Sequence, residues 1–159
     1  MQTRSEWTDV RIGPQTTITL RLIGDSILDI TTFGERSTLT QAPLMAFRNR
    51  VGAELFPPGH KYVEIYNVAN VVGIPPAEVR RQHSLFHISD AYRDCVGVYI
   101  YGSNLFLRSI YRTSLALAGS GLWYPFRVVR GYDDAVKAAY EIARGFSSVE
   151  SDVGGIKDD

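Results

Sequence analysis

Short β-rich runs alternate with longer helical patterns along most of this 159-residue chain. Residues 16–23 (TTITLRLI) alternate apolar and polar side chains, as a strand with one buried face does. A Gly-Asp-Ser turn at 24–26 leads to a second β-branched run at 27–33, so the chain is predicted to open with a hairpin. Three further β-rich runs are found at 61–68, 96–101 and 123–129. The predicted order, β-β-α-β-α-β-α-β-α, indicates an α/β fold with a mixed sheet and a mostly parallel centre.

Four helices are predicted between and after these runs. Thr38 or Thr40 is expected to cap the first helix, with Pro43 in its first turn and an end at the Pro-Pro-Gly of residues 57–59. The other three helices are expected at about 77–92, at 105–118, and from Asp133 to Gly145, a residue suited to the position just after a helix.

The predicted domain occupies residues 16–145, between two segments of different character. Residues 1–15 are polar and irregular, so an N-terminal extension is expected there. Residues 146–159 are small, acidic and rich in glycine, which is typical of a flexible tail or linker.

Composition excludes several classes of protein. Seventeen basic and seventeen acidic residues cancel, which argues against the basic face that nucleic-acid binding requires. Cys95 is the single cysteine, so no intramolecular disulfide can form and a reducing compartment is expected. The first ten residues lack the apolar region of a signal peptide, and no apolar run approaches the roughly 20 residues of a membrane span. We therefore expect a cytoplasmic protein, or a cytoplasmic part of a larger one, without membrane insertion.

The order and lengths of the predicted elements resemble the STAS domain, the fold of anti-sigma factor antagonists and of sulfate-transporter cytoplasmic domains. The resemblance is carried by YVEIYNVANVVGIPPAEVRR at 62–81 and by PFRVVRGYDDAVKAAYEIA at 125–143, and is greatest to the broader SpoIIAA-like group. It implies a mixed sheet of about five strands with four helices. It also implies a non-catalytic regulatory domain in signalling that acts through protein–protein interaction without a cofactor, and such domains can precede bacterial sensor-kinase or cyclase modules.

The chain departs from this family at the start of the second helix. Anti-sigma factor antagonists are phosphorylated there on a serine, and a phosphate is favoured by the free N–H groups of a helix N-terminus. Here the stretch reads Gly73-Ile74-Pro75-Pro76, which has no hydroxyl and lacks two N–H donors. The resemblance therefore predicts a divergent member in which a partner or ligand, rather than phosphorylation, provides any switch.

Two stretches are predicted to bind a protein partner. One is the entrance and first turns of the second helix. The other is the third helix, which is apolar over most of its surface and carries an arginine ridge, so it could serve a partner, a homodimer or simple burial. The predicted contact residues are Asn70, Ile74, Glu78, Arg80, Arg81, Arg108 and Arg112.

Tyrosines at the ends of two strands provide the alternative function, a sensor of a small apolar or aromatic ligand. Tyr66 and Tyr101 come near the carboxyl ends of strands expected to be neighbours, where α/β sheets bind ligands. Cross-strand aromatic packing explains the same pattern, and we favour it. If the pocket forms, the nearby polar side chains are Asn67, Asn70, Ser103 and Asn104.

The remaining motifs do not indicate chemistry. His83 and His87 have the spacing of a metal pair, but no third ligand is evident, so structural roles are favoured. Residues 24–26 match the Gly-Asp-Ser of some lipases, yet no downstream histidine partner follows, and a turn is the better interpretation. His60 is expected in a loop and Cys95 in the core. No catalytic residue and no metal site are predicted.

Overall fold

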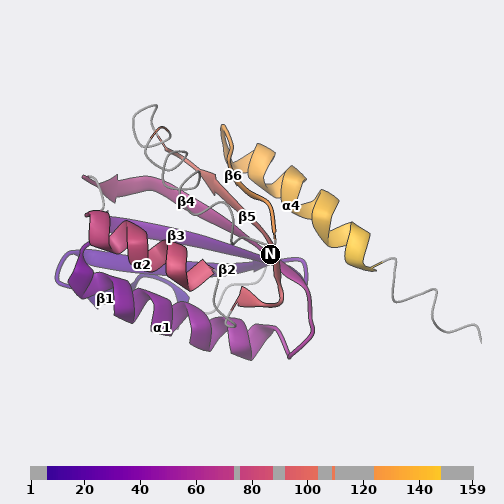
Figure 1. Cartoon of the computed structure of the whole chain (residues 1–159), viewed down its shortest axis with the longest axis horizontal. Coiled ribbons are helices and arrows are strands. Elements are labelled where there is room, and N and C mark those ends of the chain that lie inside the picture. The colour runs from indigo at the N-terminus through magenta and orange to yellow at the C-terminus, as the bar shows by residue number, and fades with distance from the viewer. Residues whose placement is uncertain (1–6, 74–75, 88–91, 104–108, 110–123, 148–159) are drawn as a thin grey trace, which may run out of the picture.

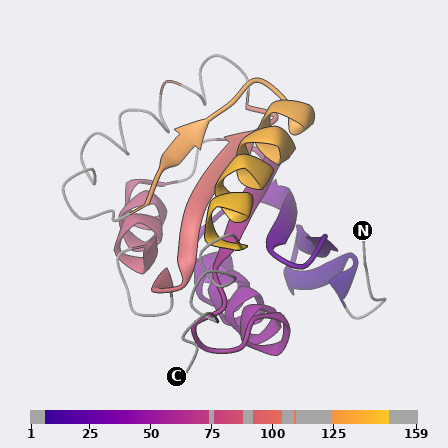
Figure 2. The same cartoon turned by 90° about the vertical axis from the view of Figure 1, so that its right-hand side faces the viewer.

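A six-stranded sheet forms the centre of the computed structural model, which describes residues 7–73, 76–87, 92–103, 109 and 124–147, without the side chains of 83–87 and 146–147. Figures 1 and 2 show α1 and α2 on one face of the sheet and α4 on the other. The strands follow the chain order across the sheet. Their bounds are β1 (Val10–Gly13), β2 (Thr16–Ile23), β3 (Ile27–Glu35), β4 (Tyr62–Val72), β5 (Cys95–Tyr101) and β6 (Phe126–Val128). The described helices are α1 (Thr38–Leu55), α2 (Ala77–His87) and α4 (Tyr132–Ser147).

The strand directions confirm the mixed sheet predicted from the sequence. β1, β2 and β3 pair antiparallel, and β3, β4, β5 and β6 pair parallel. The hairpin turn at 24–26 joins β2 to β3, as expected. Each parallel step requires a crossover connection, which explains why helical segments follow β3 and β4.

The amino-terminal segment differs from the irregular stretch that was expected. Val10–Gly13 form β1 at the edge of the sheet, and Trp7 is 1% exposed within the core on the α1 side. The sheet therefore has one strand more than predicted. The period-2 signal was missed because β1 is only four residues long and none of its residues is fully buried. The predicted helix at 105–118 lies outside the described residues, apart from Ser109, which is helical.

The sheet separates two hydrophobic cores. Leu20, Leu28 and Ile30 face α1, which buries Leu44 and Val51 against them. The opposite core packs α4 on the sheet through Ile27, Val63, Ile65, Ala135 and Ala139. The alternation predicted along β4 is confirmed, because Tyr62 and Tyr66 belong to the first core and Val63 and Ile65 to the second.

Helix boundaries differ from the prediction at several points. Ser37, rather than Thr38 or Thr40, is the N-cap of α1, and its N–H donates to Thr40 Oγ1 at 2.9 Å. Pro43 lies beyond the first turn, where burial of the surrounding apolar face outweighs one missing N–H donor. α4 begins at Tyr132, so Asp133 lies within its first turn and does not cap it, and α4 continues through Gly145 to Ser147, so Gly145 does not end it. None of the described helices has both the length and the apolar character needed to cross a membrane.

Candidate partner-binding surface

One end of the molecule gathers the carboxyl ends of two parallel strands and the beginnings of two helices. β3 ends at Glu35 and β4 at Val72, while α1 begins at Thr38 and α2 at Ala77. Figure 1 shows these ends on the left side of the view. This end includes the entrance to the second helix, where the sequence predicted a partner contact.

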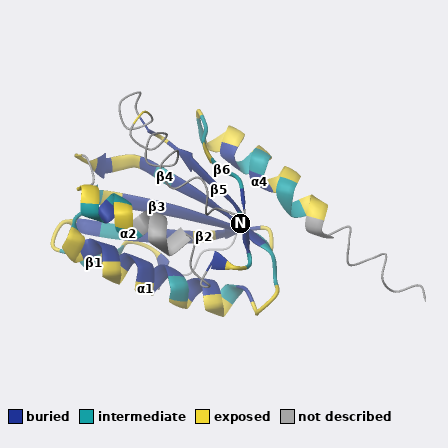
Figure 3. Ribbon diagram, viewed as in Figure 1, coloured by how far each residue is buried: buried dark blue, intermediate teal, exposed yellow. Residues whose placement is uncertain are grey.

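Large apolar side chains are exposed at this end. Leu39 in the first turn of α1 is 81% exposed, Val72 at the end of β4 is 65% exposed, and Phe33 on β3 is 37% exposed. Figure 3 shows exposed residues where β4 ends and where α1 and α2 begin. Clusters of exposed apolar side chains are typical of protein-binding surfaces, whereas isolated ones are ordinary.

The sheet register explains why Phe33 and Val72 stay uncovered. Phe33 pairs with Asn70, and Glu35 pairs with Val72, so Phe33 and Val72 lie on the same face of neighbouring strands. This is the α4 face, because Val71 points into the core on the α1 side. The sheet residues that pack with α4 extend only to Tyr101, so α4 leaves the carboxyl ends of β3 and β4 open.

A polar group lies in the first turns of α2, shortly after Val72 in the sequence and on the α1 side of the sheet (Figures 1 and 2). Arg81 donates to both carboxylate oxygens of Glu78, at 2.9 and 2.7 Å, and Gln82 donates to Glu78 at 2.9 Å. Hydrogen bonding by Arg81 lowers the pKa of Glu78, so the carboxylate keeps its charge. We call the set Phe33, Leu39, Asn70, Val72, Glu78 and Arg81 the carboxyl-end surface.

The predicted contact residues are only partly within the described structure. Asn70 is exposed on β4, which extends through residues expected to form a loop. Arg80 is half-buried, and Glu78 and Arg81 pair with one another. Three predicted residues lie outside the described part of the chain, namely Ile74, Arg108 and Arg112.

The structure does not bring the two predicted ligand-binding tyrosines together. β4 and β5 are neighbours, as expected, but Tyr101 pairs with Asn67 and Tyr66 with Ile100. Paired residues of parallel strands share a face, so this offset of one residue sends Tyr66 and Tyr101 to opposite faces of the sheet. Tyr66 lies in the core on the α1 side and Tyr101 in the core beneath α4. This placement argues against a pocket between Tyr66 and Tyr101, and it equally argues against the favoured packing of these two rings on one another.

Tyr66 instead belongs to a buried polar cluster that the sequence analysis missed. Glu64 is fully buried and accepts from Arg48 Nε at 2.5 Å, from Tyr66 at 2.9 Å and from Tyr92 at 2.6 Å. Desolvation is the largest single influence on Arg48 and opposes its charge, but Glu64 together with the three surrounding tyrosines outweighs it, and the pKa of Arg48 is raised. The sequence contained one usable signal, an acidic residue between two tyrosines on the apolar-facing side of a strand.

The described polar residues that were predicted to line the pocket have local contacts and do not surround a common cavity between Tyr66 and Tyr101. Asn67 Oδ1 accepts from the N–H of Ala69 at 3.0 Å, next to the irregular register between β3 and β4. Gly102 has a φ of 79°, and a Cβ there would meet Asn67 Oδ1 at 2.8 Å, so glycine permits the close approach. Ser103 is buried, and its hydroxyl has no hydrogen-bond partner in the described structure. Asn104 lies outside the described residues.

The Gly-Asp-Ser turn lies closer to a histidine than the sequence suggested. His60 Nε2 is 3.5 Å from Ser26 Oγ and 3.2 Å from the Asp25 carbonyl oxygen. Ser26 Oγ donates to Asp25 Oδ1 at 2.8 Å, whereas in a hydrolytic triad the carboxylate would orient the imidazole. These hydrogen bonds stabilise the turn, and their arrangement does not match that of a hydrolytic triad.

The remaining candidates from the sequence are Cys95 and the pair His83 and His87. Cys95 is fully buried, as predicted, and burial raises the pKa of its thiol, which makes it a poor nucleophile. The described residues contain no group of three or more His, Cys, Asp or Glu side chains that could hold a metal ion. The side chains of His83 and His87 lie outside the described structure.

Comparisons with known proteins identify the fold. No protein-family model matches the chain. No curated protein matches it significantly in sequence. Among solved structures, the chain is similar to an uncharacterised protein of the DUF3478 family from Shewanella loihica PV-4, which is described as having a SpoIIAA-like fold. The two share 12% sequence identity and a TM-score of 0.55, over 79% of this chain and 94% of that one. At this identity the similarity establishes the fold, and the chain has the SpoIIAA-like fold that its sequence pattern predicted.

Proposed function

We propose that this chain is a regulatory domain that binds a protein partner through the carboxyl-end surface. The observation that carries the proposal is the location of the exposed apolar side chains. Of the five large hydrophobic residues exposed in the described structure, Phe33, Leu39 and Val72 lie at this one end. The resemblance to anti-sigma factor antagonists supports the same end, because their regulated serine lies at the entrance of the second helix.

The composition of the surface suits a reversible protein contact. Apolar side chains would supply the buried centre of an interface, and the Glu78–Arg81 pair would lie at its polar rim. An exposed pair of this kind contributes little to folding, so its charges remain available to select a partner.

The proposal includes no phosphorylation of the second-helix entrance and no catalytic step. Residues 73–76 provide no hydroxyl to phosphorylate. The Ser26 hydroxyl donates to Asp25 rather than to a base. Regulation would then depend on the concentration of the partner or on a ligand elsewhere in the domain.

Substitutions on the surface test this proposal with a matched control. The purified wild type and the variants Leu39→Asp, Val72→Asp and Tyr140→Asp would each be immobilised and exposed to extract from the source cells. Tyr140 is 38% exposed on α4, so its variant introduces the same charge elsewhere. We expect specific partners to be retained by the wild type and the Tyr140 variant and lost with the other two. Equal retention by all four proteins would contradict the proposal.

Charge reversal on α2 and measurement of mass complete the test. Arg80→Glu together with Arg81→Glu should abolish partner binding, because it breaks the Glu78 pair and reverses the local charge. Sedimentation equilibrium would show whether the partner is a second copy of the chain. In that case Leu39→Asp should convert a concentration-dependent dimer into a monomer.

A further inference from the structure

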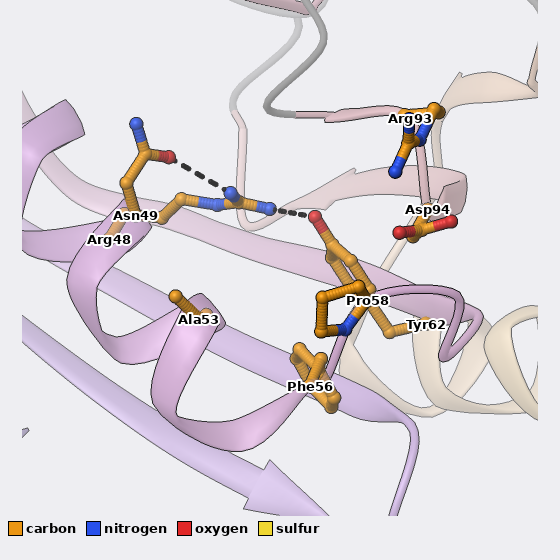
Figure 4. A pocket seen from close by; sticks show the side chains of 9 residues that line it. Arg48, Asn49, Ala53, Phe56, Pro58, Tyr62, Arg93 and Asp94 are labelled. Carbon is orange, nitrogen blue, oxygen red and sulfur yellow. Dashed lines mark hydrogen bonds between the residues drawn. The ribbon is translucent and has the colours of Figure 1, made fainter.

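A second site lies at the opposite end of the sheet, at the amino ends of β4 and β5. A cavity of about 350 Å³ opens there beside the C-terminal half of α1. Figure 4 shows Arg48, Ala53, Phe56, Tyr62 and Arg93 around it. Cavities of a few hundred Å³ accommodate small organic ligands.

The inner wall of the cavity offers a hydroxyl donor. Tyr62 is 5% exposed, and its oxygen accepts from Arg48 Nη2 at 2.5 Å. The hydrogen of the same hydroxyl has no acceptor among the described residues. Burial raises the pKa of Tyr62, so the hydroxyl keeps its proton and can donate it to a ligand.

The rim of the cavity offers a positive charge. Arg93 is exposed and forms no ion pair within the described structure. The neighbouring Asp94 carboxylate is held by Lys61 Nζ at 2.8 Å and by the N–H of Gly59 at 3.0 Å. Lys61 and Gly59 lower the pKa of Asp94 more than the charge of Arg93 does, so the exposed guanidinium of Arg93 can still attract an anion.

Most of the remaining wall is apolar. The rings of Phe56 and Tyr62 stack with centroids 4.5 Å apart and an interplanar angle of 3°. Ala53 and Pro58 continue this surface, and Gly52 lies against the buried Arg48 side chain, because a Cβ at Gly52 would be 3.6 Å from Arg48 Nη1. The second face of Phe56 is stacked on His60, with ring centroids 5.5 Å apart, so a ligand can meet Phe56 only at the edge of its ring.

We propose that this cavity binds a small aromatic carboxylate. The carboxylate would accept from the Tyr62 hydroxyl and the Arg93 guanidinium, and its ring would pack on Pro58, Ala53 and the edge of the Phe56 ring. An anion is favoured over a cation because Arg93 lies exposed on the rim, whereas Arg48 and Asp94 already have oppositely charged partners in Glu64 and Lys61. The site is remote from the carboxyl-end surface, so it does not depend on the proposed partner function.

Benzoate and its neutral analogue benzamide test the proposal. Titration of each into the purified full chain, followed by calorimetry and backbone NMR shifts, should show saturable benzoate binding with shifts centred on the ends of α1, β4 and β5. Benzamide should bind at least about tenfold more weakly. Absence of saturable benzoate binding, or equal affinity for the two compounds, would overturn the proposal.

Variants locate the site. Arg93→Gln and Tyr62→Phe should each weaken benzoate binding about tenfold or more, while Arg130→Gln, an exposed arginine beyond the carboxyl end of β6, should not. Ala53→Leu fills the cavity and should abolish binding without disturbing the fold, as judged by circular dichroism. Equal effects of Arg93→Gln and Arg130→Gln would reduce the interaction to non-specific charge attraction and reject the site. Leu39→Asp should leave benzoate affinity unchanged, which separates failure here from failure of the proposed function.

Discussion

Each face of the sheet buries one carboxylate, but the two carboxylates have different hydrogen-bond partners. Glu64, on the face covered by α1, is fully buried and accepts hydrogen bonds from an arginine and two tyrosines. Asp29, on the face covered by α4, is 2% exposed and accepts a 3.3 Å bond from Tyr101. No ion pair of Asp29 is found in the described structure.

This difference shows that two equally buried carboxyl groups can have very different partners. The guanidinium of Arg48 contacts Glu64 directly and is itself packed over the ring of Tyr92 at 4.2 Å. Asp29 has only a long hydrogen bond and the more distant charge of Arg21, and desolvation raises its pKa. The α1 face therefore has a fixed ion pair, and the α4 face has a carboxyl group whose protonation changes with pH.

Removal of one partner of the ion pair should have the largest effect. We expect Arg48→Met to cost about 3–5 kcal/mol in the free energy of unfolding, because it leaves the charge of Glu64 buried without compensation. Urea denaturation at neutral pH measures this cost. The double variant Arg48→Met with Glu64→Gln should be more stable than Arg48→Met alone. A single variant as stable as the wild type would show that the pair is not buried in solution.

The hydroxyl groups that donate to the two carboxylates should contribute differently to the free energy of unfolding. Tyr92→Phe removes a 2.6 Å bond to Glu64 and should cost about 1.5–3 kcal/mol, the range for hydrogen bonds to charged groups. Tyr101→Phe removes the long bond to Asp29 and should cost about 1 kcal/mol or less. Urea denaturation of the two variants at pH 7 compares them directly. Equal losses would remove the distinction between the faces.

Replacement of Asp29 by a neutral side chain should raise the free energy of unfolding at neutral pH. The size of this gain should be smaller than the loss expected for Tyr92→Phe. A raised pKa means that the folded state binds this proton more tightly than the unfolded chain does. The stability that this proton contributes is therefore fully present below the ordinary pKa of 3.8. That contribution is lost as the pH rises through the folded-state pKa. Asp29→Asn should thus be more stable than the wild type at pH 7, with a difference that shrinks towards pH 4. A difference independent of pH would indicate a packing effect instead.

The smallest effect is expected on the surface of α2. Glu78→Gln breaks an exposed pair with Arg81 and should leave the thermal midpoint unchanged within error. The same variant should weaken partner binding if the carboxyl-end surface is used. Calorimetry and the retention assay provide the two measurements. A clear drop in the midpoint would mean that the pair supports the helix rather than a partner.

Much of the fold was predictable because it depends on local patterns. The alternation of Tyr62, Val63, Glu64 and Ile65 correctly predicted which side chains of β4 share a face. The hairpin at 24–26 and the order of strands and helices followed from turn residues and periodicity. The edge strand β1 was missed because four partly exposed residues give too short an alternation.

The candidate sites were less predictable because they depend on contacts between distant segments. Arg48 and Glu64 are 16 residues apart, and nothing in either local pattern indicates that α1 places its arginine over this position of β4. His60 and Ser26 are 34 residues apart and meet only because β3 and β4 are neighbours. The exposure of Leu39 and Val72 likewise depends on which elements cover the sheet.

The sequence by itself determined the mixed sheet with a mostly parallel centre, the two-sided pattern of β4 and the SpoIIAA-like order of elements, because each follows from patterns along the chain. Only the tertiary structure decided the register of β4 against β5, and a shift of one residue was enough to place Tyr66 and Tyr101 on opposite faces. Register depends on packing between strands, which is the reason that a face can be predicted from periodicity while a pocket cannot.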